Sequence, residues 1–108
     1  MIKVTRMDNP WGGKGYCLIK EFLNEQQMNE KINLFAEVTL KPGCSLGYHE
    51  HIGESETYYV LQGTAAYNDS GTMRTIVKGD TIYVHNNGHS IDNIGKEDLI
   101  FMALIIRD

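Results

Sequence analysis

Three histidines and one glutamate have the types and the spacing to hold a metal ion: His49, His51, Glu56 and His89. In an extended strand, residues i and i+2 project from the same side with their Cα atoms about 6.5–7 Å apart. The imidazoles of His49 and His51 can therefore converge on one ion, while the intervening Glu50 faces away. The sequence predicts a paired-histidine site on a strand.

The other two candidate ligands depend on how the chain returns to this pair. We expect Ile52–Ser55 to turn the chain, so that an antiparallel strand starting at Glu56 places its carboxylate beside the histidines. His89 opens a later strand after a turn at Asn86–Gly88 and can supply a third imidazole. Each residue alone would be interpreted as an ordinary strand histidine or surface carboxylate. Together they suit a first-row divalent ion, and four ligands on an octahedral ion leave two positions for water or substrate.

Short strands separated by turns are expected to carry these residues. From Leu34 to Leu40, apolar and polar residues alternate with a period of two, as in a half-buried strand that ends at Lys41–Gly43. Further strands are predicted at Glu56–Leu61, Thr64–Asn68, Met73–Val77, Thr81–Val84, His89–Asn93 and Leu99–Ile106. Many short strands with turn signals between them favour an antiparallel sandwich or barrel.

Residues 1–33 are expected to form an arm and an edge strand, followed by a barrel at residues 34–108 within the same domain. Trp11–Gly15 is too rich in glycine for a regular element, and Gly15–Leu23 is a possible edge strand. Asn24–Asn29 can form one helical turn, because Asn24 is a suitable cap.

The composition excludes several classes of function. The chain has 108 residues, 42% hydrophobic and 22% charged, as in one globular domain, and its net charge of −4 leaves no cationic surplus for nucleic acid or anionic lipid. The apolar run Leu99–Ile106 is far shorter than the roughly 20 residues that span a bilayer, and Met1–Pro10 has no signal-peptide core. Cys17 and Cys44 suggest no disulfide framework. We therefore expect a cytoplasmic protein, no nucleic-acid or membrane partner, and a buried, inert thiol at Cys44.

The segment Gly43–Gly63 resembles the first motif of the cupin superfamily. That motif is Gly, five residues, His-x-His, three or four residues, Glu, six residues, Gly, and the segment follows it without a gap. Gly79 followed by His89–Asn93 is similar to the second motif, which is Gly, five residues, Pro-x-Gly, two residues, His, three residues, Asn. His85 stands where proline is usual, and the turn to His89 is one residue shorter.

The resemblance covers Leu34 to Ile106 and implies an all-β fold, a single-domain antiparallel β-barrel of the jelly-roll or double-stranded β-helix type. It implies a metal ion inside the barrel, held by His49, His51, Glu56 and His89. Among small single-domain cupins, the chain resembles bacterial proteins labelled oxalate decarboxylase-like, which resemble manganese cupins. We therefore expect one divalent transition-metal ion per chain, Mn²⁺ first, with Fe, Ni, Zn or Cu as alternatives.

Three further residues are candidates for handling a ligand. If Glu56 points into the barrel, Tyr58 and Val60 should do so too, and the Tyr58 hydroxyl either bonds a ligand or belongs to an ordinary core tyrosine. Glu54 could act as a catalytic acid or be an exposed turn residue. Arg74 could clamp a carboxylate if it points inward, although arginine on a sheet usually faces outward.

Three functions remain open. The first is a metal-dependent enzyme of decarboxylase or oxidoreductase type acting on a small organic acid such as oxalate, whose two oxygens can chelate the ion. The second is a binding or sensing module of the same fold without turnover, because fold does not determine function. The third is a metal-dependent dioxygenase.

Two predictions concern the surface. We expect a homodimer, because Ile2–Val4 or Tyr16–Ile19 could extend the sheet of a neighbouring copy. We expect His85 to be a solvated histidine beside a turn, outside the metal site.

Overall fold

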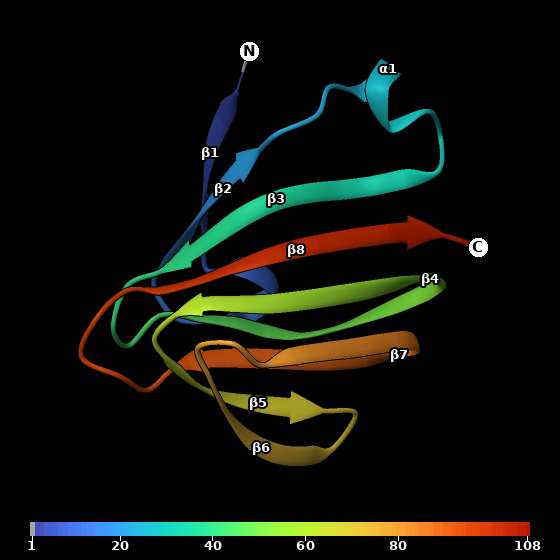
Figure 1. The fold of residues 1–108 in the computed structure, drawn as a ribbon. Coiled ribbons are helices and arrows are strands. Elements are labelled where there is room, and N and C mark those ends of the chain that lie inside the picture. Colours follow the sequence, from blue (N-terminus) through green and yellow to red (C-terminus); the bar gives the residue numbers. More distant parts are fainter. Residues whose placement is uncertain (1) are drawn as a thin grey trace.

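The regular structure of this chain is almost entirely β in the computed structural model, which describes residues 2–108. Its antiparallel strands form one hydrogen-bonded sheet in the order β1-β2-β3-β8-β4-β7-β5-β6 (Figure 1). The elements in chain order are β1 (Lys3–Asp8), the 3-10 turn η1 (Pro10–Gly12), β2 (Tyr16–Glu21), α1 (Glu25–Met28), β3 (Ile32–Leu40), β4 (Ser45–Gln62), β5 (Thr64–Asp69), β6 (Thr72–Val77), β7 (Thr81–Asn93) and β8 (Leu99–Arg107).

The two longest strands, β4 and β7, bend in the middle and so contribute to both walls of the fold. His49 pairs with His89 before the bend of β4, and from Ser55 onward β4 pairs with β7 and β8 together. The β4–β7 register shifts twice. Gly53 and Asn86 have positive φ at the bends, and the Gly53 N–H donates to the Asn86 side chain at 2.8 Å. Such irregularities curl a sheet, and Figure 1 shows β4 running out and returning.

This continuity corrects two predictions from the sequence. A turn at Ile52–Ser55 and a new strand at Glu56 are predicted, but β4 runs through both positions. Thr81–Val84 and His89–Asn93 are predicted as separate strands, but β7 includes both. The glycine and asparagine residues that indicate turns here allow a bend inside a paired strand, and pairing with the neighbouring strand resumes beyond it.

The N-terminal edge also differs from the prediction. The sequence predicts Gly15–Leu23 as the edge strand, but β2 lies between β1 and β3, and β1 forms the edge. All residues of β1 are exposed, so neither of its faces is buried. A strand without a buried face has no alternating pattern for a sequence analysis to detect.

The predicted helical turn is confirmed. Asn24 caps α1 by accepting a hydrogen bond from the Gln27 backbone at 2.8 Å, and the Gln27 side chain accepts one from the Asn24 backbone at 3.0 Å. No residue of α1 is buried, so it connects β2 to β3 without contributing to the core. Within residues 2–108, no helix combines the length and apolar composition that crossing a membrane requires.

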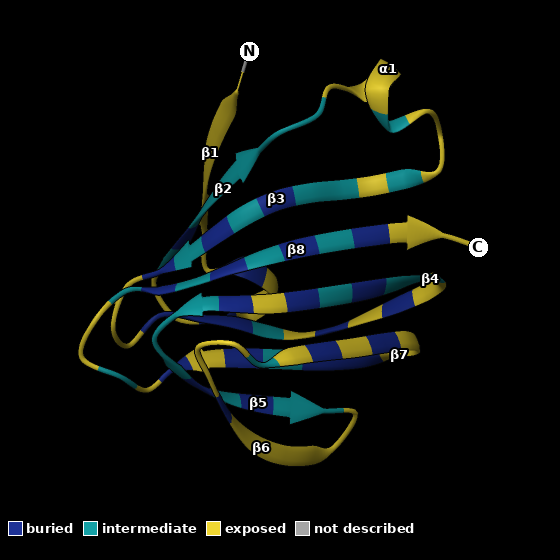
Figure 2. Cartoon of the chain, viewed as in Figure 1, coloured by how far each residue is buried: buried dark blue, intermediate teal, exposed yellow. Residues whose placement is uncertain are grey.

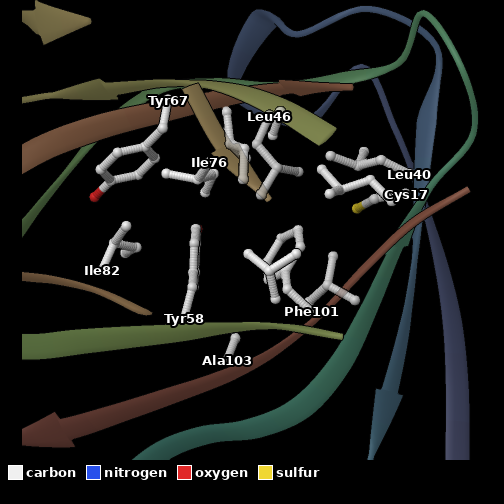
Figure 3. Packing of buried hydrophobic residues seen from close by; sticks show 14 of the residues in the cluster. Cys17, Leu40, Leu46, Tyr58, Tyr67, Ile76, Ile82, Phe101 and Ala103 are labelled. Atoms are coloured by element: carbon white, nitrogen blue, oxygen red, sulfur yellow. The ribbon is translucent and has the colours of Figure 1, made fainter. Parts of the chain in front are cut away.

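The core fills the space between the two walls. Alternate residues of β3, β4 and β8 are buried, as the dark-blue bands of Figure 2 show. Tyr58 and Val60 are buried as predicted, and Tyr59 between them is exposed. Figure 3 shows side chains of the two walls pointing toward one another, with a lower row of Ile82, Tyr58, Phe101 and Ala103 facing an upper row of Tyr67, Ile76 and Leu46. Cys17 and Cys44 are buried free thiols.

Candidate metal centre

The four predicted ligands meet inside the fold. His49 and His51 lie before the bend of β4, Glu56 lies beyond it, and His89 lies on β7 opposite His49. Their ligand atoms all lie within 4.8 Å of one another, and all four residues are buried. The bend of β4 therefore brings the carboxylate to the histidines, and strand pairing brings the third imidazole.

Three of the four ligand atoms have the spacing of neighbours around one ion. The Nε2 atoms of His51 and His89 are 3.1 Å apart, and Glu56 Oε1 lies 2.9 Å from the first and 3.0 Å from the second. Two ligands that bind at about 2.0–2.2 Å and at right angles lie about 3 Å apart. These atoms therefore fit adjacent positions around a divalent ion.

The second nitrogen of His49 and of His51 is held by a hydrogen-bond acceptor. His49 Nδ1–H donates to the Gly47 carbonyl at 2.7 Å, and His51 Nδ1–H donates to Glu54 Oε2 at 2.6 Å. A proton on Nδ1 leaves the lone pair on Nε2, which is the atom that faces Glu56. Both rings are thus oriented with a ligand atom toward the centre.

His89 has a corresponding partner in Tyr67, whose hydroxyl lies 2.7 Å from His89 Nδ1. With the proton on Nδ1, the hydroxyl oxygen accepts it, and Nε2 keeps its lone pair. Burial raises the pKa of Tyr67, so the phenol stays neutral. Three imidazole lone pairs and one carboxylate then face the centre of the cluster. None of these four groups carries a proton that it could donate to another. This set of atoms fits a cation.

The ionisation of the cluster reflects competition between burial and mutual contact. Burial lowers the pKa of His49. Burial also lowers the pKa of His51, but the hydrogen bonds that its protonated ring donates to Glu56 and Glu54 outweigh burial, and the net pKa is raised. Burial would raise the pKa of Glu56, yet the imidazoles of His51 and His89, which would donate to its carboxylate when protonated, hold the pKa below its ordinary value. Glu56 is therefore a carboxylate at neutral pH, as a metal ligand must be.

A cavity of about 60 Å³ adjoins the cluster. His49, His51, Glu56 and Tyr58 form its polar end. The remaining wall is apolar apart from a thiol and an indole, and consists of Trp11, Cys17, Ile19, Leu34, Val38, Leu46, Ala103 and Ile105. An open depression of about 850 Å³ lies elsewhere, between α1 and the ends of neighbouring strands. We assign the site to the smaller cavity because three of the four ligands, His49, His51 and Glu56, line it.

The other candidate residues have different positions. The Tyr58 hydroxyl lies 3.4 Å from His89 Nε2, at the edge of the cluster. Glu54 contacts the Nδ1 side of His51, away from Glu56. Arg74 is exposed and lies 3.3 Å from Asp69, outside the cavity.

His85 also lies outside the site. It is part of β7, and its Nε2 lies 2.9 Å from an oxygen of the exposed Asp108. Its side chain is 41% exposed, and it does not line the cavity. The residue that replaces the usual proline of the second motif thus contacts the C-terminal residue and none of the four ligands.

Two site residues are not predicted from the sequence. Trp11 belongs to a segment predicted only as a glycine-rich arm, but its ring stacks on His49 with centroids 4.1 Å apart and planes at 19°. Tyr67 is one of several strand tyrosines, and its contact with His89 depends on the pairing of β5 with β7. Trp11 is the single tryptophan of the chain and lies next to two glycines, which is the one local signal available.

The fold and the buried histidine–glutamate cluster define a small protein of the cupin class. The chain belongs to this family, because the cupin domain model matches residues 36–105. It is similar to the oxalate-binding protein of Thermotoga maritima, with 41% identity over 106 residues, which are 97% of this chain and 88% of that protein.

Solved structures agree with this assignment. The crystal structure of a predicted oxalate decarboxylase from Thermotoga maritima has a TM-score of 0.94 and 40% identity, and the match covers 99% of this chain and 94% of that one. A polyketide cyclase from Streptomyces resistomycificus has a TM-score of 0.77 and 17% identity over 98% of this chain and 73% of that one, so it shares the fold alone. The resemblance to cupins and the predicted all-β fold are confirmed.

Proposed function

We propose that this protein binds one divalent transition-metal ion, Mn²⁺ first, and through it a small carboxylate such as oxalate. The observation that carries the proposal is the convergence of three Nε2 atoms and the Glu56 carboxylate, with each Nδ1 held by a separate acceptor. When bound, the ion supplies a Lewis acid that coordinates carboxylate oxygens and offsets their charge. The similarity to a protein named for oxalate binding supports this choice of ligand.

The surroundings of the cluster favour binding over decarboxylation. A decarboxylase needs a proton donor at the reacting carbon and a cation near the free carboxylate. Glu54 is hydrogen-bonded to His51 Nδ1, and Arg74 lies outside the cavity. Burial raises the pKa of Tyr58 well above its ordinary value, so its hydroxyl stays protonated and serves as a hydrogen-bonding group. No lysine or arginine lines the cavity within the described residues.

The residues around the ion have separate tasks in this proposal. His49, His51, Glu56 and His89 hold the metal. Their Nδ1 partners orient the three rings before the metal arrives, which reduces the cost of ordering them on binding. The apolar wall excludes water and therefore strengthens the contact between the ion and a charged ligand.

The test measures metal and ligand together. Native mass spectrometry of untreated protein should find one divalent ion per chain. Isothermal titration should detect oxalate binding to Mn²⁺-loaded protein and none to metal-free protein. Absence of metal-dependent oxalate binding would contradict the proposal. Incubation of the loaded protein with oxalate, with and without oxygen, should yield no product, and measurable product would favour the decarboxylase or dioxygenase instead.

The proposed partner in assembly is a second copy of this chain, joined at β1. This strand is one edge of the sheet, β6 being the other, and its exposed apolar residues include Val4 and Met7. The alternative segment, Tyr16–Ile19, belongs to β2, which already pairs with β1 and β3. Of these two N-terminal segments, β1 is therefore the one with an unpaired edge.

A further inference from the structure

Trp11 forms the solvent-facing side of the cavity beside the metal ligands. It is 51% exposed, and Ile19 and Leu34 are half-buried, whereas the other residues that line the cavity are buried. The ring also stacks on His49. Trp11 is therefore the most exposed residue of the cavity wall and borders the way in from solvent.

The arm that carries Trp11 is attached closely to β4. Lys14 N–H donates to Ser45 Oγ at 2.8 Å, and Ser45 N–H donates to the Lys14 carbonyl at 2.9 Å. A Cβ on Gly13 would lie 2.1 Å from the Ser45 carbonyl oxygen, and one on Gly47 would lie 2.0 Å from the Trp11 carbonyl oxygen. Only glycine at these two positions lets the two backbones lie in direct contact.

The backbone of the arm is unusual for the residues it carries. Trp11 has φ 50° and ψ 38°, and Asn9 has φ 45°, both in the left-handed region. A bulky side chain disfavours this region, and such residues persist where the surrounding structure holds them. The chain thus places its one tryptophan in a costly conformation, and the position it reaches is directly above a metal ligand.

We infer that Trp11 determines which carboxylates the site accepts by limiting their size. This inference rests on the proposed function and names the ligand class of the same site. A cavity of about 60 Å³ is small, because one water molecule takes up about 30 Å³ in the liquid. It therefore favours an acid as short as oxalate, and a longer carbon chain competes with the indole for the same space. Because the rest of the wall is apolar, removal of the ring opens room for an apolar tail.

The test uses three 2-oxo acids with the same chelating end and tails of increasing length, with the dianion oxalate as the reference ligand. Oxalate, pyruvate, 2-oxobutanoate and 2-oxo-4-methylpentanoate are titrated into Mn²⁺-loaded protein by calorimetry. In the unaltered protein, affinity should fall as the tail lengthens. In Trp11→Ala, 2-oxo-4-methylpentanoate should bind at least about tenfold more tightly than in the unaltered protein, the discrimination that a hydrophobic pocket exerts for a methylene or more. Oxalate affinity should change less.

Three variants separate size selection from other effects. Trp11→Phe keeps a flat ring over His49 and should retain most of the discrimination. Gly13→Ala keeps the indole but pushes the arm away from β4, so it should accept the longer acid as Trp11→Ala does. Tyr83→Ala removes an exposed aromatic ring that does not line the cavity and should leave every affinity unchanged.

A fluorescence measurement checks the position of the ring independently of any acid. The single tryptophan is the only indole emitter, and a paramagnetic ion bound by His49 would lie close to it, because the indole stacks on that imidazole. Adding Mn²⁺, Ni²⁺ or Co²⁺ should therefore quench the emission of the unaltered protein and leave that of His51→Ala nearly unchanged. Unchanged emission in the unaltered protein at full metal loading would overturn the placement of Trp11.

The possible results separate failure of size selection by Trp11 from failure of the proposed metal and carboxylate binding. If Trp11→Ala binds metal and oxalate normally and still rejects the longer acids, size selection by Trp11 is overturned and the proposed function stands. If Trp11→Ala and Trp11→Phe both lose metal, Trp11 supports His49 instead, and size selection is again overturned. If the loaded, unaltered protein binds none of the acids, the proposed function fails and the inference fails with it.

Discussion

The buried cluster and the N-terminal edge of this protein are organised in opposite ways. At the cluster, His89 and Glu56 are 0% and 3% exposed, and each histidine is hydrogen-bonded through Nδ1. At the edge, every residue of β1 is exposed on a strand with one neighbour.

The difference shows where side-chain positions are fixed by hydrogen bonds and where they are not. A buried polar group without a partner is costly, and no buried side-chain nitrogen or oxygen in residues 2–108 lacks one. Each histidine ring is therefore held through its Nδ1 atom, and the lone pairs that face one another at the centre are left for a cation. Exposed polar groups on β1 do not have this cost, because they can hydrogen-bond to water. We expect substitutions at the cluster to change metal binding strongly, and substitutions at the edge to change association only.

The largest effect should follow loss of a ligand. His51→Ala removes one Nε2 donor and should reduce metal content to near zero, because the remaining three residues no longer provide the full donor set. His85→Ala is the matched control, since this exposed histidine contacts Asp108 instead. Metal per chain, measured by inductively coupled plasma mass spectrometry, should stay near one in the control. Full occupancy in His51→Ala would disprove the assignment of the cluster.

A smaller effect should follow loss of the group that orients His51. Glu54→Ala removes the 2.6 Å acceptor of His51 Nδ1 and should weaken Mn²⁺ binding by about 10- to 100-fold. Glu54→Gln keeps an acceptor oxygen but no charge, so it should recover part of the loss. Glu50→Ala, at an exposed position between His49 and His51, is the control. Equal affinities in all three, measured by competition with a chelating dye, would mean that Glu54 does not position the ligand.

The pH dependence of metal binding should report the same contact. Burial lowers the pKa of His51, but the hydrogen bonds that its protonated ring donates to Glu56 and Glu54 outweigh burial and hold the pKa above the ordinary value of 6.5. Protons and metal compete for Nε2, so Mn²⁺ affinity is full above this raised pKa and falls as the pH drops through it.

Glu54→Gln weakens one cause of the raised pKa and should move the midpoint of Mn²⁺ binding to lower pH. Titrations followed by electron paramagnetic resonance between about pH 5 and about pH 8 would measure this shift. A midpoint at the same pH in both proteins would indicate that Glu54 does not act on the protonation of His51.

The smallest effect on the stability of the folded monomer is expected for substitutions on the edge strand β1. Val4→Lys places a charge on β1, where Val4 is 60% exposed, and should shift the sedimentation mass toward the monomer. The free energy of unfolding should change by no more than about 0.5 kcal/mol, because the site is on the surface. Ile52→Lys, at an exposed position of β4, is the control and should leave association unchanged. A monomeric mass for the unaltered protein at micromolar concentration would remove the proposed dimer.

Much of the site could be predicted because its signals are local. His49 and His51 are two positions apart on one strand, and that spacing suffices to place both rings on one face. The alternation from Leu34 to Leu40 likewise predicts a half-buried strand, which is observed as part of β3. The exposed β1 and the continuous β7 could not be predicted, because the first has no buried face and the second contains turn residues.

Residue types and short spacings by themselves determined the donor atoms of this protein, the strands that carry them and the likeness to cupins. Only the tertiary structure decided that β4 and β7 bend instead of breaking, that Glu54 faces His51 Nδ1, and that Trp11 covers the cavity. These outcomes depend on pairing between segments that are distant in the chain. They also depend on the direction in which each side chain points at a bend. Local periodicity carries no information about either, because it describes one strand at a time.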